Sequence, residues 1–139
     1  MDRTNKTPRG IRNNNPLNIE RTGDKWLGMR AEQSDQRFVQ FETTAYGYRA
    51  AIVILRNYVA RYGLKTLRQV LHRWAPPTEN NTDGYLSTVS HRAKILPDTP
   101  LNMWDVEPVT RLLEAMTYVE CGQPGDRTAI HTAYSLLEQ

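Results

Sequence analysis

The sequence has a single cysteine and no long apolar run. Because Cys121 has no second cysteine to pair with, no intramolecular disulfide can form, and the fold must rest on packing alone. The longest apolar stretch, residues 50–55, is far too short to cross a bilayer. The N-terminal residues are polar and basic, without the apolar segment of a signal peptide. We therefore expect neither a membrane anchor nor an export signal.

Several functional classes lack their usual motifs. The three histidines have no ligand spacing, either with one another or with the cysteine, so we expect no metal site. No glycine-rich phosphate-binding loop occurs, and we expect no cofactor. The net charge of +3 is scattered along the chain, which suits a polyanionic partner or only solubility. Nucleic-acid binding rests on basic residues such as Arg49, Arg56 and Arg61 alone, and it ranks last.

The 139 residues fit one domain. Residues 1–8 read as a polar tail and residues 9–139 as the domain. Residues 9–18 are rich in Gly, Asn and Pro and predict a structured turn. Two short alternating segments, residues 17–19 and 37–41, bracket a Thr-Gly-Asp turn and predict a small β-hairpin.

The rest of the chain has helical periodicity and helix-terminating residues, which predict five helices. The first is capped by Thr43 or Thr44, carries Ala51, Ile54, Leu55, Tyr58 and Tyr62 on one face, and ends at Gly63. The others begin at Thr66, Thr82, Asp105 and Asp126, with the second stopped by Pro76-Pro77 and the fourth by Gly122. The expected fold is α+β and predominantly α-helical, with one small β-hairpin.

The fourth predicted helix carries an unusual carboxylate. Its apolar stripe includes Met116, and Glu120 follows four residues later on the same face. Burial and the nearby helix C-terminus would both raise the pKa of Glu120. A glutamic acid that is protonated near neutral pH is what protonating a glycosidic oxygen requires. Pairing with an arginine, or a side chain turned to water, is the alternative.

Glycoside hydrolysis usually needs a second carboxylate. Glu20, Glu42 and Glu79 are the available residues, and solvated surface charge is the simpler interpretation of each. A lytic transglycosylase needs one carboxylate only, so the single good acid favours that chemistry. Cys121 is better explained as a small buried residue than as a nucleophile.

Aromatic and amide side chains near loops suit a sugar ligand. Trp26, Trp74 and Tyr85 could stack on sugar rings, and asparagines could bond hydroxyl and N-acetyl groups. The alternative is that the tryptophans close the core and the asparagines shape turns; for Trp74, which continues an apolar stripe, the core is the better interpretation.

Five stretches, which together cover nearly the whole chain, resemble a phage and prophage family described as virion-associated or lysozyme-like: RGIRNNNPLNIE, GDKWLG, RFVQFETTAYGYRAAIVILRNY, LRQVLHRWAPPTENNTDGYLSTVS and LLEAMTYVECG. A more distant similarity links the chain to flagellar-type β-N-acetylglucosaminidases and to goose-type lysozymes and lytic transglycosylases. By this resemblance Tyr85 lines a catalytic cleft with Glu120. The expected substrate-binding residues are Asn14, Asn15, Trp26, Glu79 and Thr82.

In those enzymes the catalytic glutamate ends a helix that precedes the Asn-Asn stretch, whereas here the matching helix lies near the C-terminus. A circular permutation of a lysozyme-like fold would reconcile the two orders, since chain termini often lie close together.

The leading hypothesis is a phage or prophage protein, of the endolysin or virion type, that cleaves peptidoglycan glycan strands as a glycosidase or lytic transglycosylase. It would be made in the bacterial cytoplasm without a signal peptide and act in the periplasm and cell wall or as a virion component. Its partners would be glycan strands and other virion or lysis proteins. The alternative is a non-catalytic virion module that retains a lysozyme-like fold.

Overall fold

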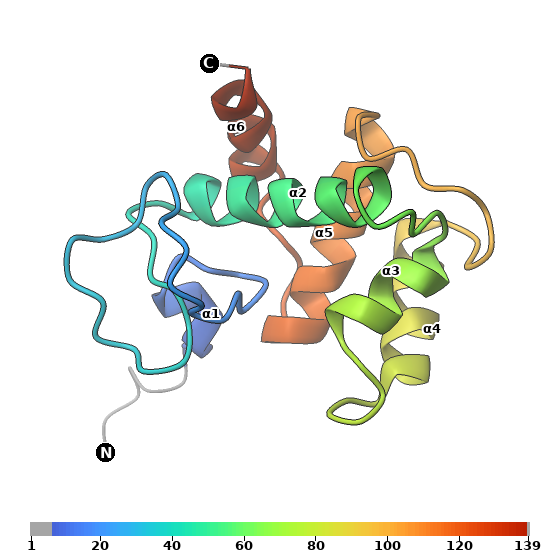
Figure 1. The fold of residues 1–139 in the computed structure, drawn as a ribbon, viewed down its shortest axis with the longest axis horizontal. Coiled ribbons are helices and arrows are strands. Elements are labelled where there is room, and N and C mark those ends of the chain that lie inside the picture. Colours follow the sequence, from blue (N-terminus) through green and yellow to red (C-terminus); the bar gives the residue numbers. More distant parts are fainter. Residues whose placement is uncertain (1–6, 139) are drawn as a thin grey trace.

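A computed structural model describes residues 7–138 of the chain. These residues form, in order, α1 (Arg9–Arg12), α2 (Thr44–Ala60), α3 (Leu67–Trp74), α4 (Thr82–Ala93), α5 (Val106–Cys121) and α6 (Arg127–Leu137). Figure 1 shows α1 and the long segment before α2 at one end of the molecule, α3 and α4 at the other, and α2, α5 and α6 between them. Apart from Thr7 and Pro8, the predicted tail lies outside the described residues.

The five long helices predicted from the sequence are confirmed, and capping explains most of their ends. The Thr43 hydroxyl accepts the Tyr46 N–H at the start of α2. At α3, Thr66 and Gln69 form a reciprocal capping box. The Asp126 carboxylate accepts the Ala129 N–H at 3.1 Å and so caps α6.

Two details of the helix prediction are wrong. Asn81, rather than Thr82, caps α4, because its side chain accepts the Gly84 N–H. Thr82 is the first helical residue, and its hydroxyl donates to the Ala75 carbonyl oxygen. The first long helix ends at Ala60 instead of Gly63, so Tyr62 lies beyond it with an exposed side chain.

The predicted β-hairpin, and with it the α+β class, is wrong. Residues 7–138 contain isolated bridges, such as Glu20 with Phe38 and Met29 with Phe41, and no sheet. A backbone bond from Val39 N–H to the Ile19 carbonyl links the two segments at 3.0 Å, and the Asn15 side-chain amide also donates to the carbonyls of Ile19 and Val39. The segment is irregular chain on a helical fold.

The core lies where α2 packs on α6 and α4 packs on α5. Its fully buried side chains come from every long helix and include Leu55, Leu71, Val89, Leu113 and Ile130. A buried hydrogen bond of 2.8 Å between Tyr48 Oη and Thr117 Oγ1 ties α2 to α5, and burial raises the pKa of Tyr48 to about 12. These contacts fix α5, whose C-terminal end meets the segment after α1.

Candidate functional site

The turn after α1 lies directly against the end of α5. Asn14 and Asn18 both adopt left-handed backbone conformations, with φ of 51° and 55°, which asparagine tolerates better than most residues. The approach requires glycine at position 10, since a Cβ there would lie 2.7 Å from Asn18 Oδ1 and 2.9 Å from Cys121 Sγ. The Cys121 thiol donates to the Pro16 carbonyl at 3.2 Å. The turn thereby brings Asn18 to the last turn of α5.

Glu120, in that last turn, is held by side chains from two other parts of the chain. Asn18 Nδ2 donates to Glu120 Oε1 at 3.0 Å. The Tyr85 hydroxyl, from α4, donates to Glu120 Oε2 at 3.0 Å. The Glu120 side chain is half-buried, whereas Tyr85 is 7% exposed. Both carboxylate oxygens therefore have a fixed donor, and the group keeps access to the surface.

Burial decides the protonation of this cluster. Desolvation raises the pKa of Glu120 above its ordinary value, although hydrogen bonds from Asn18, Tyr85 and Trp74 act in the opposite direction. Burial, together with the negative charge of Glu120, raises the pKa of Tyr85 well above 10 and keeps its hydroxyl a donor. Burial also raises the pKa of Cys121 to about 11, so this thiol stays protonated at neutral pH and is a poor nucleophile.

Glu120 lines a cleft of about 350 Å³ between the segment after α1 and the end of α3. The apolar lining residues include Ile54, Tyr58 and Trp74, and the rings of Tyr58 and Trp74 pack edge to face with centroids 6.4 Å apart. The polar lining residues include Asn18, Glu20, Thr22, Arg37, Glu79 and Asn80. A cleft lined by both apolar and hydrogen-bonding side chains suits a sugar ring, which has both kinds of surface.

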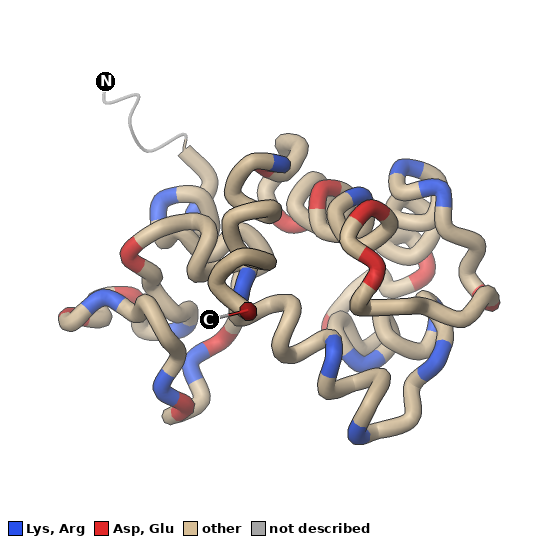
Figure 2. The backbone as a smooth tube through the Cα atoms, turned by 90° about the horizontal axis from the view of Figure 1, so that it is seen from above, with Lys and Arg blue, Asp and Glu red and all other residues tan. Residues whose placement is uncertain are grey.

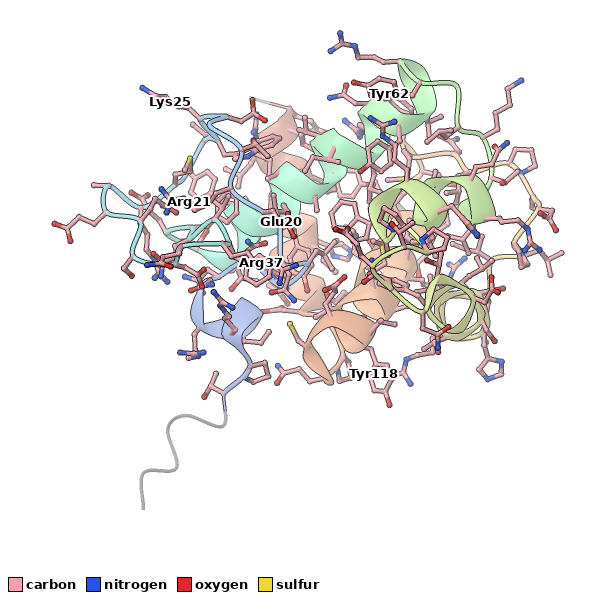
Figure 3. All side chains as sticks on the ribbon, turned by 60° about the horizontal axis from the view of Figure 1, so that its bottom comes forward. Glu20, Arg21, Lys25, Arg37, Tyr62 and Tyr118 are labelled. Atoms are coloured by element: carbon pink, nitrogen blue, oxygen red, sulfur yellow. The ribbon has the colours of Figure 1, made fainter. Side chains whose placement is uncertain are left out.

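Two of the three additional carboxylates considered from the sequence lie in this cleft. Glu20 and Glu79 are among its lining residues, whereas Glu42 is exposed elsewhere. Glu20 is paired with Arg37, with Oε1 and Nη2 2.9 Å apart. Figure 3 shows the two labelled side chains close together on the face that contains the cleft.

Four predicted substrate-binding residues lie outside the lining of the cleft. Asn15 is fully buried and bonded to backbone groups. Asn14 donates to the carbonyls of residues 41 and 42. Trp26 packs on the core from the long segment, and Thr82 is bonded inside the start of α4. The contacts of these four residues therefore stabilise the local structure.

The sequence did not indicate Asn18 or Arg37 as site residues. Asn18 bonds to Glu120, and Arg37 pairs with Glu20. Trp74 was assigned to the core, yet it also lines the cleft and interacts with Glu120. The only sequence signal for Asn18 was the turn composition around Pro16. That composition predicts a turn but does not say which asparagine faces a carboxylate more than a hundred residues away.

Metal ligands, membrane-spanning helices and the distribution of charge were considered for the described residues. In residues 7–138, no three His, Cys, Asp or Glu side chains are grouped closely enough to hold a metal ion. None of the described helices has the length and apolar character needed to span a membrane. Figure 2 shows basic and acidic residues interspersed along the backbone.

The fold and this site define a small helical protein with a protonatable carboxylate in an open, polar and aromatic cleft. No protein-family model matches the sequence. The chain is 37% identical over 121 residues to Protein P5 of Pseudoalteromonas phage PM2, and the match covers 85% of this chain and 74% of that protein. The chain therefore belongs to the family of Protein P5, and this relationship supports a bacteriophage origin.

Proposed function

We propose that this protein cleaves the glycan strands of peptidoglycan, with Glu120 as general acid and base. The observation that carries the proposal is a carboxyl group of raised pKa, held by Tyr85 and Asn18 at a cleft whose lining includes the aromatic residues Tyr58 and Trp74. A carboxylic acid needs such an environment to donate a proton near neutral pH.

In the proposed reaction, the Glu120 proton passes to the glycosidic oxygen as the bond between that oxygen and the anomeric carbon breaks. The hydrogen bonds from Asn18 and Tyr85 then stabilise the carboxylate that this step leaves behind. The carboxylate next accepts a proton from the incoming nucleophile as the oxygen of that nucleophile bonds to the anomeric carbon. That nucleophile is the sugar's 6-hydroxyl in a transglycosylase and water in a hydrolase.

The choice between the two nucleophiles depends on a second carboxylate. One well-held acid is sufficient for transglycosylation, whereas Glu20 or Glu79 in the same cleft could serve hydrolysis. Mass spectrometry of released muropeptides separates the routes, because transglycosylation leaves 1,6-anhydro ends and hydrolysis leaves reducing ends.

The contact between α5 and the asparagine-rich turn also supports the proposal. That contact places a side-chain amide donor on the carboxylate that would act as acid and base. Glu120 and Asn18 are 3.0 Å apart between their bonded atoms although they are 102 positions apart in sequence. A protein of phage origin, as the similarity to Protein P5 supports, also meets peptidoglycan on entering or leaving its host.

The direct test is Glu120→Gln, which keeps the size of the side chain and removes the proton donor. We expect it to lower muropeptide release from purified sacculi by about a hundredfold or more. Glu42→Gln, at an exposed position outside the cleft, is the matched control and should keep wild-type activity. If Glu120→Gln is as active as the wild type, Glu120 is not the acid.

A non-catalytic virion module is the second candidate. The similarity to Protein P5, a phage protein, is consistent with a virion component. If the wild type releases no muropeptides at any pH between 4 and 8 (about the range over which carboxyl groups and histidines titrate), this candidate replaces the enzyme.

A further inference from the structure

Arg37 and Glu20 form an exposed ion pair at the edge of the cleft that contains Glu120. Arg37 Nε and Nη2 both donate to the same oxygen, Glu20 Oε1, at 3.2 and 2.9 Å. The two side chains are 65% and 59% exposed, and both line the cleft. The proposed transglycosylation at Glu120 does not use this pair.

The Arg37 guanidinium, although exposed, contacts an aromatic ring as well as Glu20. Its central carbon, Cζ, lies 4.9 Å from the centre of the Phe38 ring. The Cζ atom of Arg9 lies 4.7 Å from the centre of the same ring. Arg9 in turn is paired with Asp35, which also accepts the backbone N–H groups of Arg37 and Phe38. Arg37 is thus positioned before any ligand arrives.

The guanidinium also has unused donors. Among residues 7–138, Arg37 Nη1 has no hydrogen-bond acceptor, and Glu20 uses only one of its two oxygens. Arginine binds a carboxylate most strongly through two parallel N–H groups, each to its own oxygen. The pair with Glu20 lacks this geometry, and exposed ion pairs contribute little to stability. An incoming carboxylate can therefore displace Glu20 readily.

We propose that Arg37 binds a carboxylate of the peptide or lactyl substituent of a glycan strand, and that Glu20 occupies this place in the free protein. The inference rests on the proposed function, since it names the substrate feature that the cleft would select. Under this proposal, Arg37 and Glu20 make the protein bind glycans with acidic substituents in preference to uncharged glycans of the chitin type.

The pair makes an unusual prediction, because its two members should have opposite effects. Arg37→Gln removes the ligand for the substrate carboxylate and should weaken binding of an acidic glycan. Glu20→Gln removes the competing charge and should strengthen the same binding. A pair with only a structural role would weaken binding when either member is changed.

The experiment measures binding by calorimetry in the Glu120→Gln background, which prevents turnover. The ligands are a soluble peptidoglycan tetrasaccharide that carries its stem peptides, and chitotetraose. We expect Arg37→Gln to weaken binding of the first by roughly tenfold and to leave chitotetraose unchanged, while Glu20→Gln tightens the first. Arg37→Lys, which keeps the charge but loses the fork, should lie between wild type and Arg37→Gln.

Lys25→Gln and Glu32→Gln are the matched controls, because they make the same charge changes at exposed positions outside the cleft. Thermal melts of every variant verify folding. If Arg37→Gln affects both ligands equally or neither, or if Glu20→Gln weakens the acidic ligand, the inference is overturned while the proposed function stands. If the parent protein binds neither glycan, the proposed function fails and the inference fails with it.

Discussion

Two regions of the molecule, the irregular segment before α2 and the helices from α2 onward, are stabilised by different kinds of contact. Residues 13–43 contain no helix and depend on side chains that bond to the backbone, notably those of Asn15, Asp35 and Gln40. Residues 44–138 depend on apolar faces of helices, with Leu55 and Leu113 fully buried. The first region is specified by individual polar residues, and the second by a repeated pattern.

This difference matters because the candidate site lies where the two regions meet. Asn18, Glu20 and Arg37 come from the irregular region, whereas Tyr85 and Glu120 come from the helices. Polar groups that hold an irregular segment also orient its side chains toward the cleft. Stability and site geometry should therefore respond differently to changes on the two sides.

The largest expected effects come from one buried residue on each side. Leu113→Ala should lower the free energy of unfolding by about 3 kcal/mol, because it removes a buried side chain and leaves a cavity.

Asn15→Ala should lower the free energy of unfolding by about 2 kcal/mol, because buried backbone groups of Ile19 and Val39 lose their partners.

Urea denaturation measures both losses, and amide hydrogen exchange separates them. Leu113→Ala should lower protection throughout the helices, and Asn15→Ala should first lower it in residues 17–41. Equal loss of protection in both regions of the Asn15→Ala variant would contradict the contrast between them.

A smaller effect is expected for Asp35→Asn, which tests the polar side alone. The Asp35 carboxylate is bonded by Arg9, Asn13 and two backbone N–H groups, and the hydrogen bond from Arg9 holds its pKa well below the usual range. The substitution should lower stability at pH 7 by about 1 kcal/mol.

The effect of Asp35 should depend on pH in a definite direction. A lowered pKa in the folded state contributes stability above the unfolded pKa of about 4, and this contribution is lost as the pH falls through the folded value. Urea midpoints of wild type and Asp35→Asn should therefore converge in acid. A constant difference from pH 7 down to pH 2 (about two units below that unfolded value) would argue against the carboxylate as the cause.

The smallest expected change is the effect of Glu120→Gln on stability. Because burial raises the pKa of Glu120, its ionised form destabilises the fold at neutral pH, and its stabilising protonated form is lost as the pH rises through the folded pKa. The variant should gain stability relative to wild type as the pH rises from about 4, the unfolded value. Thermal melts across this range test it.

Much of the helical region could be predicted because its signals are local. Helical periodicity and capping residues predicted every long helix. The errors were the cap of α4, which is Asn81 instead of the predicted Thr82, and the end of α2, which lies at Ala60 instead of Gly63. The β-hairpin prediction failed because alternating residues at 17–19 and 37–41 satisfy burial without a ladder: Leu17, Ile19, Val39 and Phe41 are buried in irregular chain.

The candidate site was predicted in part. The position of Glu120 on an apolar helix face followed from spacing, and resemblance suggested Tyr85; the structure brings their side chains within hydrogen-bonding distance. Asn14, Asn15 and Trp26 were expected at the ligand, but their contacts lie within the scaffold. The composition of a turn does not state which of its amides face inward.

The sequence by itself determined where the long helices lie and that one of them carries a carboxylate on its apolar face, because both depend on spacing along a few turns. Only the tertiary structure decided that Asn18, Tyr85 and Glu120 meet and that Arg37 and Glu20 flank their cleft. Contacts between residues far apart in sequence depend on how the elements pack. Here that packing depends on a close approach at Gly10 and on individual polar side chains, which leave no periodic signal.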